Sequence, residues 1–385
     1  MTTPLLIHAD SLRDADMFVA TGVPIVDPFT YLELDGRRII VASVLEKDVI
    51  ERDSRATEIW RDDDFGAREL VREGWDYEDA VMERVRRVLE RAGVSDVAVP
   101  PTFPVALADY LRGKDVTVTP DRQAFEMRRR LKNADQLNAI RQAQTATEAS
   151  FRAARELLAS ASPGDGGLVA DGDLVTCERV RDVIVSTLRA HGCEGEAPLV
   201  GAGPRGALVH DLGSGPIHPG EPIIIDVFPQ NAASRYCADM TRTFCWGEAP
   251  ERLKQMHATV LEALKRSTEA IAPGVPGERP WEIACDVIEQ GGFRTTRGLA
   301  PGETLDEDFF HGLGHGVGVE VHEAPNMGLG AREELLAGDV VTVEPGVYRK
   351  DFGGVRLEDL VVVTDNGHEV LTDFDYELEI KALDD

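Results

Sequence analysis

Two segments in the C-terminal part of the chain repeat one pattern, and this repeat constrains the fold more than any other feature. Residues 220–226 read GEPIIID, and residues 338–344 read GDVVTVE. In each, a glycine and an acidic residue precede four residues rich in β-branched side chains, and a carboxylate stands six positions after the glycine. Because β-branched residues favour strands, each segment predicts a strand that ends at a carboxylate, Asp226 or Glu344.

A second acid follows each of these strands at a similar distance. Asp239 lies thirteen residues after Asp226, and Glu358 lies fourteen residues after Glu344, each on the expected return strand of a hairpin. We therefore predict a duplicated hairpin unit that contributes two carboxylates per copy. A carboxylate at the end of a buried strand is unfavourable unless it is paired or bound to a cation. One such acid most simply marks a strand end in an acidic protein, but four at duplicated positions indicate a cation site.

A segment rich in histidine and glycine supplies a further ligand. Residues 309–325, FFHGLGHGVGVEVHEAP, contain three histidines, and glycine at every second position of residues 312–318 argues against a helix. Alternating glycines allow a strand to approach another backbone or a ligand closely, so His315 is predicted to reach the carboxylates. His311 has the strand parity of His315. His322 lies seven residues after His315 and joins the site only if the chain bends.

The predicted ligand set determines which cation chemistry is expected. It consists of Asp226, Asp239, His315, Glu344 and Glu358. A mostly oxygen set with four negative charges suits two divalent ions and favours manganese or cobalt, with zinc or iron as alternatives. Two such ions can hold a bridging hydroxide and polarise the carbonyl that it attacks, so hydrolysis is the expected chemistry. The polar neighbours expected beside the acids, Thr241, Thr243 and Arg356, suit hydrogen bonds that orient the carboxylates.

The length and the order of the predicted elements indicate two domains. A chain of 385 residues is longer than one domain of the usual size, about 100–200 residues. Residues 1–128 alternate short strand-like runs with helical stretches, which predicts a small α/β domain without a catalytic cluster. Residues 129–385 open with a long helical pattern capped by Asn133 and Gln136 and then contain the hairpin repeat. The predicted fold class of the whole chain is α+β.

The composition excludes several classes of partner. The chain contains 69 acidic and 41 basic residues, and 7 of the basic residues are lysines. The resulting net charge of −28 repels nucleic acid and anionic lipid. Because carboxylates keep a surface hydrated in strong salt, we hypothesise a halophilic protein. No apolar run approaches the ~20 residues of a membrane span, and no signal peptide is visible, so a cytoplasmic location is expected. The five cysteines contain no C-x-x-C pair and are predicted to be reduced core residues.

Taken in order, these motifs resemble those of the pita-bread metallopeptidases, the family of methionine aminopeptidase, aminopeptidase P, prolidase and creatinase. The resemblance covers roughly residues 130–385 through the motifs IIIDVF, ADMTRTF, HGLGHGVGVEVHEAP, TVEPGVY and GGVRLED. It implies a creatinase-like N-terminal domain in residues 1–128 and a pita-bread catalytic domain in residues 129–385. It also implies a homodimer and the same five metal ligands, with Asp239 and Glu358 bridging the two ions.

The resemblance further implies roles that spacing alone does not assign. Glu344 would shuttle a proton between the attacking water and the leaving nitrogen. His210 and His322 would contact the substrate and stabilise the tetrahedral intermediate. His311 and Arg356 would lie in the substrate site or directly behind the ligands.

The resulting expectation is a metal-dependent exopeptidase that hydrolyses Xaa-Pro bonds in peptides, of the aminopeptidase P or prolidase type. The extra N-terminal domain favours this branch over methionine aminopeptidase. The alternatives are a creatinase-like C–N hydrolase that works without metal, and a pita-bread domain retained only as a binding module. The complete ligand set argues against both. The sequence leaves open the native metal, the preferred substrate length, the residue before proline and the oligomeric state.

Overall fold

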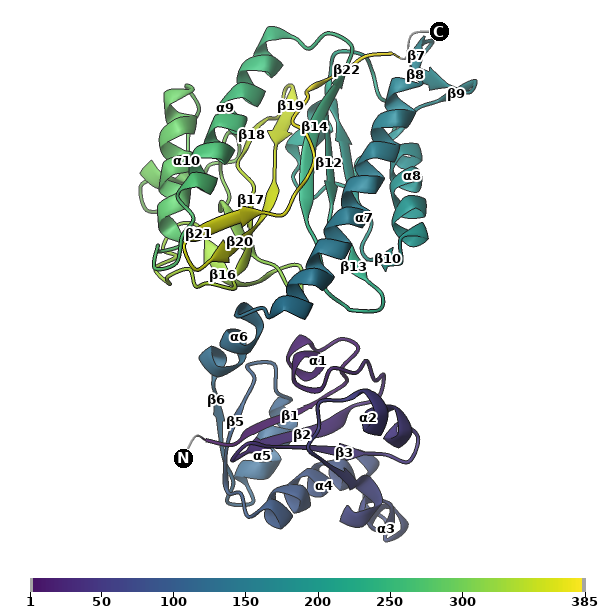
Figure 1. Cartoon of the computed structure of the whole chain (residues 1–385), viewed down its shortest axis with the longest axis vertical. Coiled ribbons are helices and arrows are strands. Elements are labelled where there is room, and N and C mark those ends of the chain that lie inside the picture. The colour runs from purple at the N-terminus through teal and green to yellow at the C-terminus, as the bar shows by residue number, and fades with distance from the viewer. Residues whose placement is uncertain (1–2, 383–385) are drawn as a thin grey trace. The chain divides into compact units, whose positions relative to one another are not determined.

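The computed structural model describes residues 3–382, and the chain divides into two compact units, Met1–Arg129 and Arg130–Asp385 (Figure 1). This division and the predicted boundary after residue 128 both fall within helix α6 (Arg122–Arg130). In the described part of the chain, no helix combines the length and the apolar character that a membrane crossing requires.

The first unit is built on a six-stranded sheet in the order β4-β3-β2-β1-β5-β6. The pairs β1/β2 and β2/β3 are antiparallel, and the other neighbours are parallel. The strands are β1 (Leu5–Ala9), β2 (Phe29–Leu34), β3 (Arg37–Ala42), β4 (Glu58–Arg61), β5 (Asp96–Val99) and β6 (Thr117–Pro120). The helices before α6 are α1 (Ala15–Thr21), α2 (Lys47–Asp53), the 3-10 turn η1 (Asp62–Phe65), α3 (Ala67–Arg72), α4 (Tyr77–Ala92) and α5 (Val105–Arg112).

Helix α4 shows how the local sequence produces these elements. The side chain of Asp76 caps its N-terminus by accepting a hydrogen bond from the backbone N–H of Glu78. Gly93 ends the helix with a φ of 70°, a left-handed conformation that glycine adopts without strain. Val85 and Leu89 lie on its buried face and pack into the core beneath the sheet. Caps and apolar spacing together therefore define this helix.

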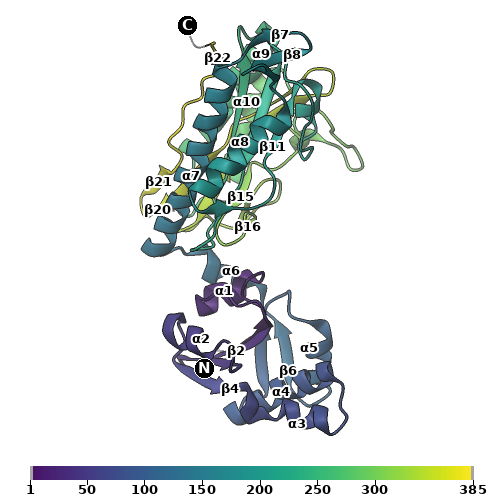
Figure 2. The same cartoon turned by 90° about the vertical axis from the view of Figure 1, so that its right-hand side faces the viewer.

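The second unit has two main sheets, with helices on either side of them (Figures 1 and 2). Their strand orders are β11-β12-β14-β22 and β16-β15-β17-β20-β21. The first contains β11 (Leu199–Ala202), β12 (Pro222–Val227), β14 (Met240–Trp246) and β22 (Glu379–Ile380). The second contains β15 (Gly314–Gly316), β16 (Glu323–Met327), β17 (Val340–Val343), β20 (Asp359–Thr364) and β21 (Gly367–Val370).

Smaller strands and the helices complete this unit. The small strands are β7 (Ser162–Gly164), β8 (Gly167–Ala170), β9 (Asp173–Leu174), β10 (Cys193–Glu194), β13 (Gln230–Asn231), β18 (Gly346–Arg349) and β19 (Gly353–Arg356). The α-helices are α7 (Ala134–Ala159), α8 (Cys177–Ala190), α9 (Glu251–Glu269) and α10 (Glu278–Gln290). Two 3-10 turns are η2 (Gly203–Ala207) and η3 (Thr296–Gly298).

The predicted hairpin repeat is present in this unit. Strand β12 pairs antiparallel with β14, which sets Asp226 opposite Thr241. Strand β17 pairs antiparallel with β20, which sets Val343 opposite Asp359. One apolar core joins the first hairpin to α7 and α8, and another joins the second hairpin to α9 and α10 (Figure 1). The duplication that the sequence pattern predicted is therefore confirmed.

The return strand of the second hairpin differs from the continuous strand that the sequence predicted. Strand β19 ends at Arg356 and β20 begins at Asp359, so Glu358 lies in a break between them. Strand β19 pairs with β18 instead of β17. The break exists because the chain passes here beside the first hairpin, where the backbone N–H of Glu358 donates to the carbonyl of Thr241 at 3.0 Å.

Two other local predictions are confirmed. The Asn133 side chain accepts from the backbone N–H of Gln136 at 3.0 Å, and the Gln136 side chain accepts from the backbone N–H of Asn133 at 2.8 Å. This reciprocal pair is the predicted cap of α7. All five cysteines are free and buried.

Candidate metal centre

The five predicted ligands come from both hairpins and from the glycine-rich segment. Asp226 is in β12, and Asp239 directly precedes β14. His315 is the central residue of β15. Glu344 directly follows β17, and Glu358 directly precedes β20. Each ligand thus sits in or beside a strand of the two main sheets.

Three of these residues lie close enough together to hold one metal ion. Asp239, His315 and Glu358 each offer a ligand atom within 4.8 Å of the other two. The Nε2 atom of His315 lies 3.8 Å from Asp239 Oδ2 and 3.3 Å from Glu344 Oε1. One imidazole nitrogen and several carboxylate oxygens at this spacing are a suitable donor set for a divalent cation.

The glycines beside His315 are required by the close packing of the strands. A Cβ atom on Gly314 would lie 2.1 Å from the carbonyl oxygen of Thr342, and one on Gly316 would lie 2.2 Å from that of Ala324. Both obstacles are backbone atoms, which cannot move aside as a flexible side chain can. The alternating glycines therefore allow β15 to lie tightly between β16 and β17 and to carry His315 to the carboxylates.

We expect Gly314→Ala to lower stability and weaken metal binding, because the added methyl group must displace the backbone that positions His315. Overpacking of this kind costs about 1–3 kcal/mol. Urea unfolding measures the stability, and calorimetric titration measures the metal affinity. Gly298→Ala is the matched control, because nothing lies within 4 Å of a Cβ atom at Gly298. Equal metal affinities for the two variants would contradict this account of the packing.

Asp226 has a different environment from the other acids. Its Oδ2 atom forms an ion pair with the guanidinium of Arg356. Within residues 3–382 its Oδ1 atom is buried without a hydrogen-bond partner. A buried carboxylate oxygen in this state is unfavourable, so Oδ1 fits the role of a cation ligand.

A buried tyrosine connects two predicted substrate-site residues. Arg356 donates to the hydroxyl of Tyr348 at 3.2 Å, and this hydroxyl lies 3.0 Å from Nε2 of His311. His311 is therefore linked through Tyr348 to Arg356. Tyr348 was not among the predicted site residues. Its place four residues after Glu344, with the same strand parity, is the signal that could have revealed it.

Of the two threonines expected to orient carboxylates, only Thr241 donates to one, and the arginine has a different partner from the one predicted. Thr241 donates to Glu358 Oε2 at 2.7 Å, and Thr243 donates to the carbonyl of Arg356 at 2.9 Å. Arg356 was predicted beside Glu358, whereas its guanidinium pairs with Asp226. The break between β19 and β20 separates Arg356 from the strand face of Glu358 and explains the difference.

Burial and mutual repulsion shift the pKa values of three acids. Burial, followed by the charges of Glu358, Asp226 and Glu344, raises the pKa of Asp239 well above its usual range. Burial and the charges of Glu344 and Asp226 do the same to the pKa of Glu358. Burial also raises the pKa of Asp226. A divalent cation would remove this penalty on the anionic forms, so the residues present fit a metal centre.

Glu344 differs from the other acids. Burial acts to raise its pKa, but the hydrogen bond and the charge of His315 outweigh burial and bring the pKa to about 2. The same contact raises the pKa of His315 against the effect of burial. Glu344 is therefore the acid of the cluster that ionises most readily, and its anionic carboxylate is available as a cation ligand.

The strand that carries His315 is short, and the bend after it brings a further histidine to the cluster. Strand β15 stops at Gly316, and its register with β16 shifts at that point. The ring of His322 consequently lies edge-on to that of His315, with centroids 4.2 Å apart. His210 is exposed in the loop after η2. Burial lowers the pKa of His322, and His315 and His210 lower it further, which places His210 in the same neighbourhood.

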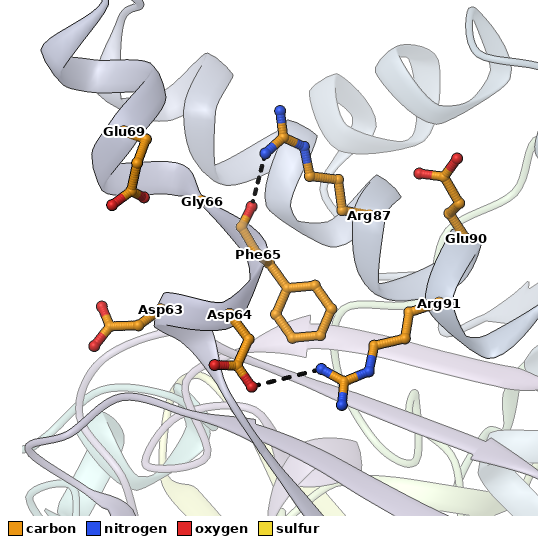
Figure 3. Close-up of a pocket in the computed structure, with 8 residues that line it drawn as sticks. All are labelled: Asp63, Asp64, Phe65, Gly66, Glu69, Arg87, Glu90 and Arg91. Carbon is orange, nitrogen blue, oxygen red and sulfur yellow. Dashed lines mark hydrogen bonds and ion pairs between the residues drawn. The ribbon is translucent and has the colours of Figure 1, made fainter.

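A separate hollow in the first unit has a different lining (Figure 3). It is lined by Asp63, Asp64, Phe65, Gly66, Glu69, Arg87, Glu90 and Arg91. Arg91 pairs with Asp64 at 3.5 Å, and Arg87 donates to the carbonyl of Phe65 at 3.2 Å (Figure 3). The lining is therefore strongly charged, and it contains none of the predicted site residues.

Comparison with known proteins adds a family context to this geometry. Residues 138–365, more than half of the chain, match metallopeptidase family M24. An Xaa-Pro dipeptidase of Pyrococcus furiosus is 35% identical over 194 residues, which are 50% of this chain and 52% of that protein. The uncharacterized peptidase YqhT of Bacillus subtilis is 28% identical over 269 residues, which are 69% of each chain. The chain thus spans about half the length of the dipeptidase that it matches.

Solved structures share the fold over nearly the whole chain. An X-Pro aminopeptidase of Thermotoga maritima has a TM-score of 0.78 and 22% identity, with 98% of this chain and 97% of that chain covered. An Xaa-Pro dipeptidase of Bacillus anthracis has a TM-score of 0.79 and 22% identity, with coverage of 98% and 94%. The predicted fold class is confirmed by these similarities.

Proposed function

Because the chain belongs to metallopeptidase family M24, we propose that it is a metal-dependent exopeptidase that hydrolyses Xaa-Pro bonds. The substrate class is taken from the Xaa-Pro dipeptidase of Pyrococcus furiosus, to which the chain is similar over half of its own length. The observation that carries the proposal is the cluster of Asp239, His315 and Glu358, whose ligand atoms lie within 4.8 Å of one another.

Five side chains would hold two divalent cations. They are Asp226, Asp239, His315, Glu344 and Glu358, of which Asp239 and Glu358 would bridge the ions. Manganese or cobalt suits this set best, because carboxylate oxygens dominate it. When bound, such a pair lowers the pKa of a water molecule and polarises the scissile carbonyl.

The other steps belong to side chains of the site. Glu344, whose carboxylate lies 3.3 Å from Nε2 of His315 in the cluster, would accept a proton from the attacking water and deliver it to the leaving nitrogen. His322 and His210 are exposed beside the cluster and would stabilise the negative charge that develops on the carbonyl oxygen. His311 and Arg356, which share one tyrosine hydroxyl, would line the substrate site.

A homodimer and a cytoplasmic location are further parts of this proposal. The homodimer rests on the family resemblance, and light scattering of the purified protein tests it. The location rests on the interpretation of the N-terminal sequence, and fractionation of cells that express the protein tests it.

Activity should depend both on metal and on proline. After removal of metal with a chelator, we expect no hydrolysis of Xaa-Pro dipeptides or of longer Xaa-Pro peptides, and recovery on addition of manganese or cobalt. The preference between the two substrate lengths separates prolidase from aminopeptidase P. Hydrolysis of creatine that survives the chelator would favour the creatinase-like alternative. Inactivity on every substrate, together with tight binding of a protein, would favour the binding module.

Strong salt should raise the melting temperature if the halophilic hypothesis is correct. With a net charge of −28, the acidic side chains repel one another in the compact folded state. Screening shortens the range of this repulsion from about 10 Å at 0.1 M salt to about 3 Å at 1 M. Calorimetric scans across potassium chloride concentrations up to the molar range measure the effect. A melting temperature that does not respond would indicate an ordinary acidic protein, and the activity assays need the same salt series.

A further inference from the structure

A buried ion pair ties the segment between α6 and α7 to the strand that follows His322. Lys132 Nζ lies 2.5 Å from Glu323 Oε1, and both side chains are 1% exposed. The backbone N–H of Lys132 also donates to the carbonyl of Gly338 at 3.2 Å. Glu323 is the first residue of β16 and directly follows His322. Lys132 thus contacts a residue of the site region that lies 191 positions further along the chain.

Glu323 also supports the bend that precedes it. Its carboxylate lies so close to Gly318 that a Cβ atom there would be 2.3 Å from Oε1. The carbonyl of Gly318 accepts a hydrogen bond from the backbone N–H of Cys237 at 2.7 Å, two residues before Asp239. The Glu323 carboxylate therefore packs against the turn that carries His322, and this turn is bonded to the segment that leads to a predicted metal ligand.

His322 has few contacts of its own to hold it. Its side chain is exposed, and within residues 3–382 its ring meets His315 edge-on but forms no hydrogen bond. A functional side chain without such bonds takes its position from its backbone and from the residues that support the backbone. On its C-terminal side this support is Glu323.

We propose that Lys132 is a positioning residue for His322 and acts through Glu323. The inference rests on the proposed function, because it takes His322 as a group that contacts the substrate. Lys132 does not reach the reacting atoms. It fixes the direction of the Glu323 side chain and, through it, the turn that presents His322. A displacement of about 1 Å in such a group can lower a rate about 100-fold.

The chemistry of the pair favours an orienting role over a stabilising one. Removal of two charges from water is so unfavourable that a buried ion pair adds little net stability, and a well-packed apolar pair is often at least as stable. An ion pair, however, holds its two groups at one distance and direction. Glu323 Oε2 is buried without a partner within residues 3–382, so Lys132 is the cation that compensates this carboxylate.

Four variants separate positioning from stability. Lys132→Met leaves Glu323 charged and unpaired, whereas the double variant Lys132→Met/Glu323→Met removes both charges and should recover stability. Lys132→Arg keeps the charge. Arg130→Met is the control, because Arg130, at the end of α6, forms an equally buried ion pair with Asp339, with side chains 1% and 0% exposed, and also pairs with Glu333.

In the metal-loaded enzyme, Lys132→Met is expected to lower kcat for an Xaa-Pro dipeptide by about 10- to 100-fold. KM should change less, and the metal content should stay the same. The double variant should regain the melting temperature while kcat stays low, because two apolar side chains do not orient the turn. Hydrogen exchange should accelerate in residues 317–325 for Lys132→Met and for the double variant. For Arg130→Met it should accelerate near residues 334–340 instead. Lys132→Arg should retain most of the activity.

Two results would overturn the proposal. The first is recovery of kcat together with the melting temperature in the double variant, which would show that the pair serves stability alone. The second is equal exchange in residues 317–325 for Lys132→Met and Arg130→Met. If Lys132→Met does not fold, the double variant and Glu323→Gln carry the same test. A wild-type protein without activity on Xaa-Pro peptides would refute the proposed function, while the exchange measurement would still decide whether Lys132 orders the turn.

Discussion

Glu344→Gln should lower kcat for an Xaa-Pro dipeptide by about 10²- to 10⁴-fold. Glutamine has the size of glutamate, so the packing around β17 is preserved, but its amide cannot accept a proton from water and return it to the leaving nitrogen. The substitution also removes the charge that lies 3.3 Å from His315 Nε2. Initial rates at saturating metal and substrate measure the effect.

Glu262→Gln is the control for this experiment, because Glu262 is exposed on α9 and outside the cluster. Metal analysis of the purified Glu344→Gln protein distinguishes loss of a ligand from loss of proton transfer. A variant that retains its metal and loses activity supports proton transfer by Glu344. A kcat within tenfold of the wild type would show that another group carries the proton.

Divalent metal should raise the melting temperature of the chelated protein on the order of 10 °C. A ligand at 1,000 times its Kd contributes about 4 kcal/mol of stability. In a domain of the size of the second unit, each 1 kcal/mol shifts the melting temperature by about 2–4 °C. The physical reason is the buried cluster of acids, in which the raised pKa values of Asp239 and Glu358 report the unfavourable anionic forms. Calorimetric scans with and without manganese or cobalt measure the shift.

The effect of Asp239→Asn on the melting temperature should have opposite signs without and with metal. Without metal, the variant should melt at a higher temperature than the wild type, because one of the mutually repelling acids is gone. With metal, it should melt at a lower temperature, because a ligand is lost. Asp182→Asn, at an exposed position on α8, should change neither value. A chelated Asp239→Asn protein that melts below the chelated wild type would argue against repulsion within the cluster.

The candidate ligands could be predicted from the sequence because most of them lie at the ends of short, strongly patterned strands. Asp226 and Glu344 each end a run of β-branched residues, and strand parity placed Thr241 beside the acids, where it donates to Glu358. The capping pair that opens α7 was equally visible, because a cap depends on residues three positions apart. Such signals are local, and burial of the strands does not change them.

Other parts of the site could not be predicted, since they depend on how segments meet. The break before Glu358 arises where the chain passes beside the first hairpin, and strand propensity contains no sign of that contact. Because of the same break, Arg356 pairs with Asp226, which lies 130 residues away in the sequence. Strand parity could have indicated that Tyr348 faces the site. Its hydrogen bonds with His311 and Arg356 could not be predicted, because sequence spacing does not show which segments come together.

Local pattern alone was thus sufficient to predict a set of candidate ligands and the repeated hairpin that carries most of them, because strand propensity, parity and charge belong to each segment. The three-dimensional packing decided which acid pairs with Arg356, how the bend after β15 brings His322 beside His315, and that Lys132 supports this bend. Those outcomes depend on contacts between segments far apart in the chain, whose energies arise only when the whole unit is assembled.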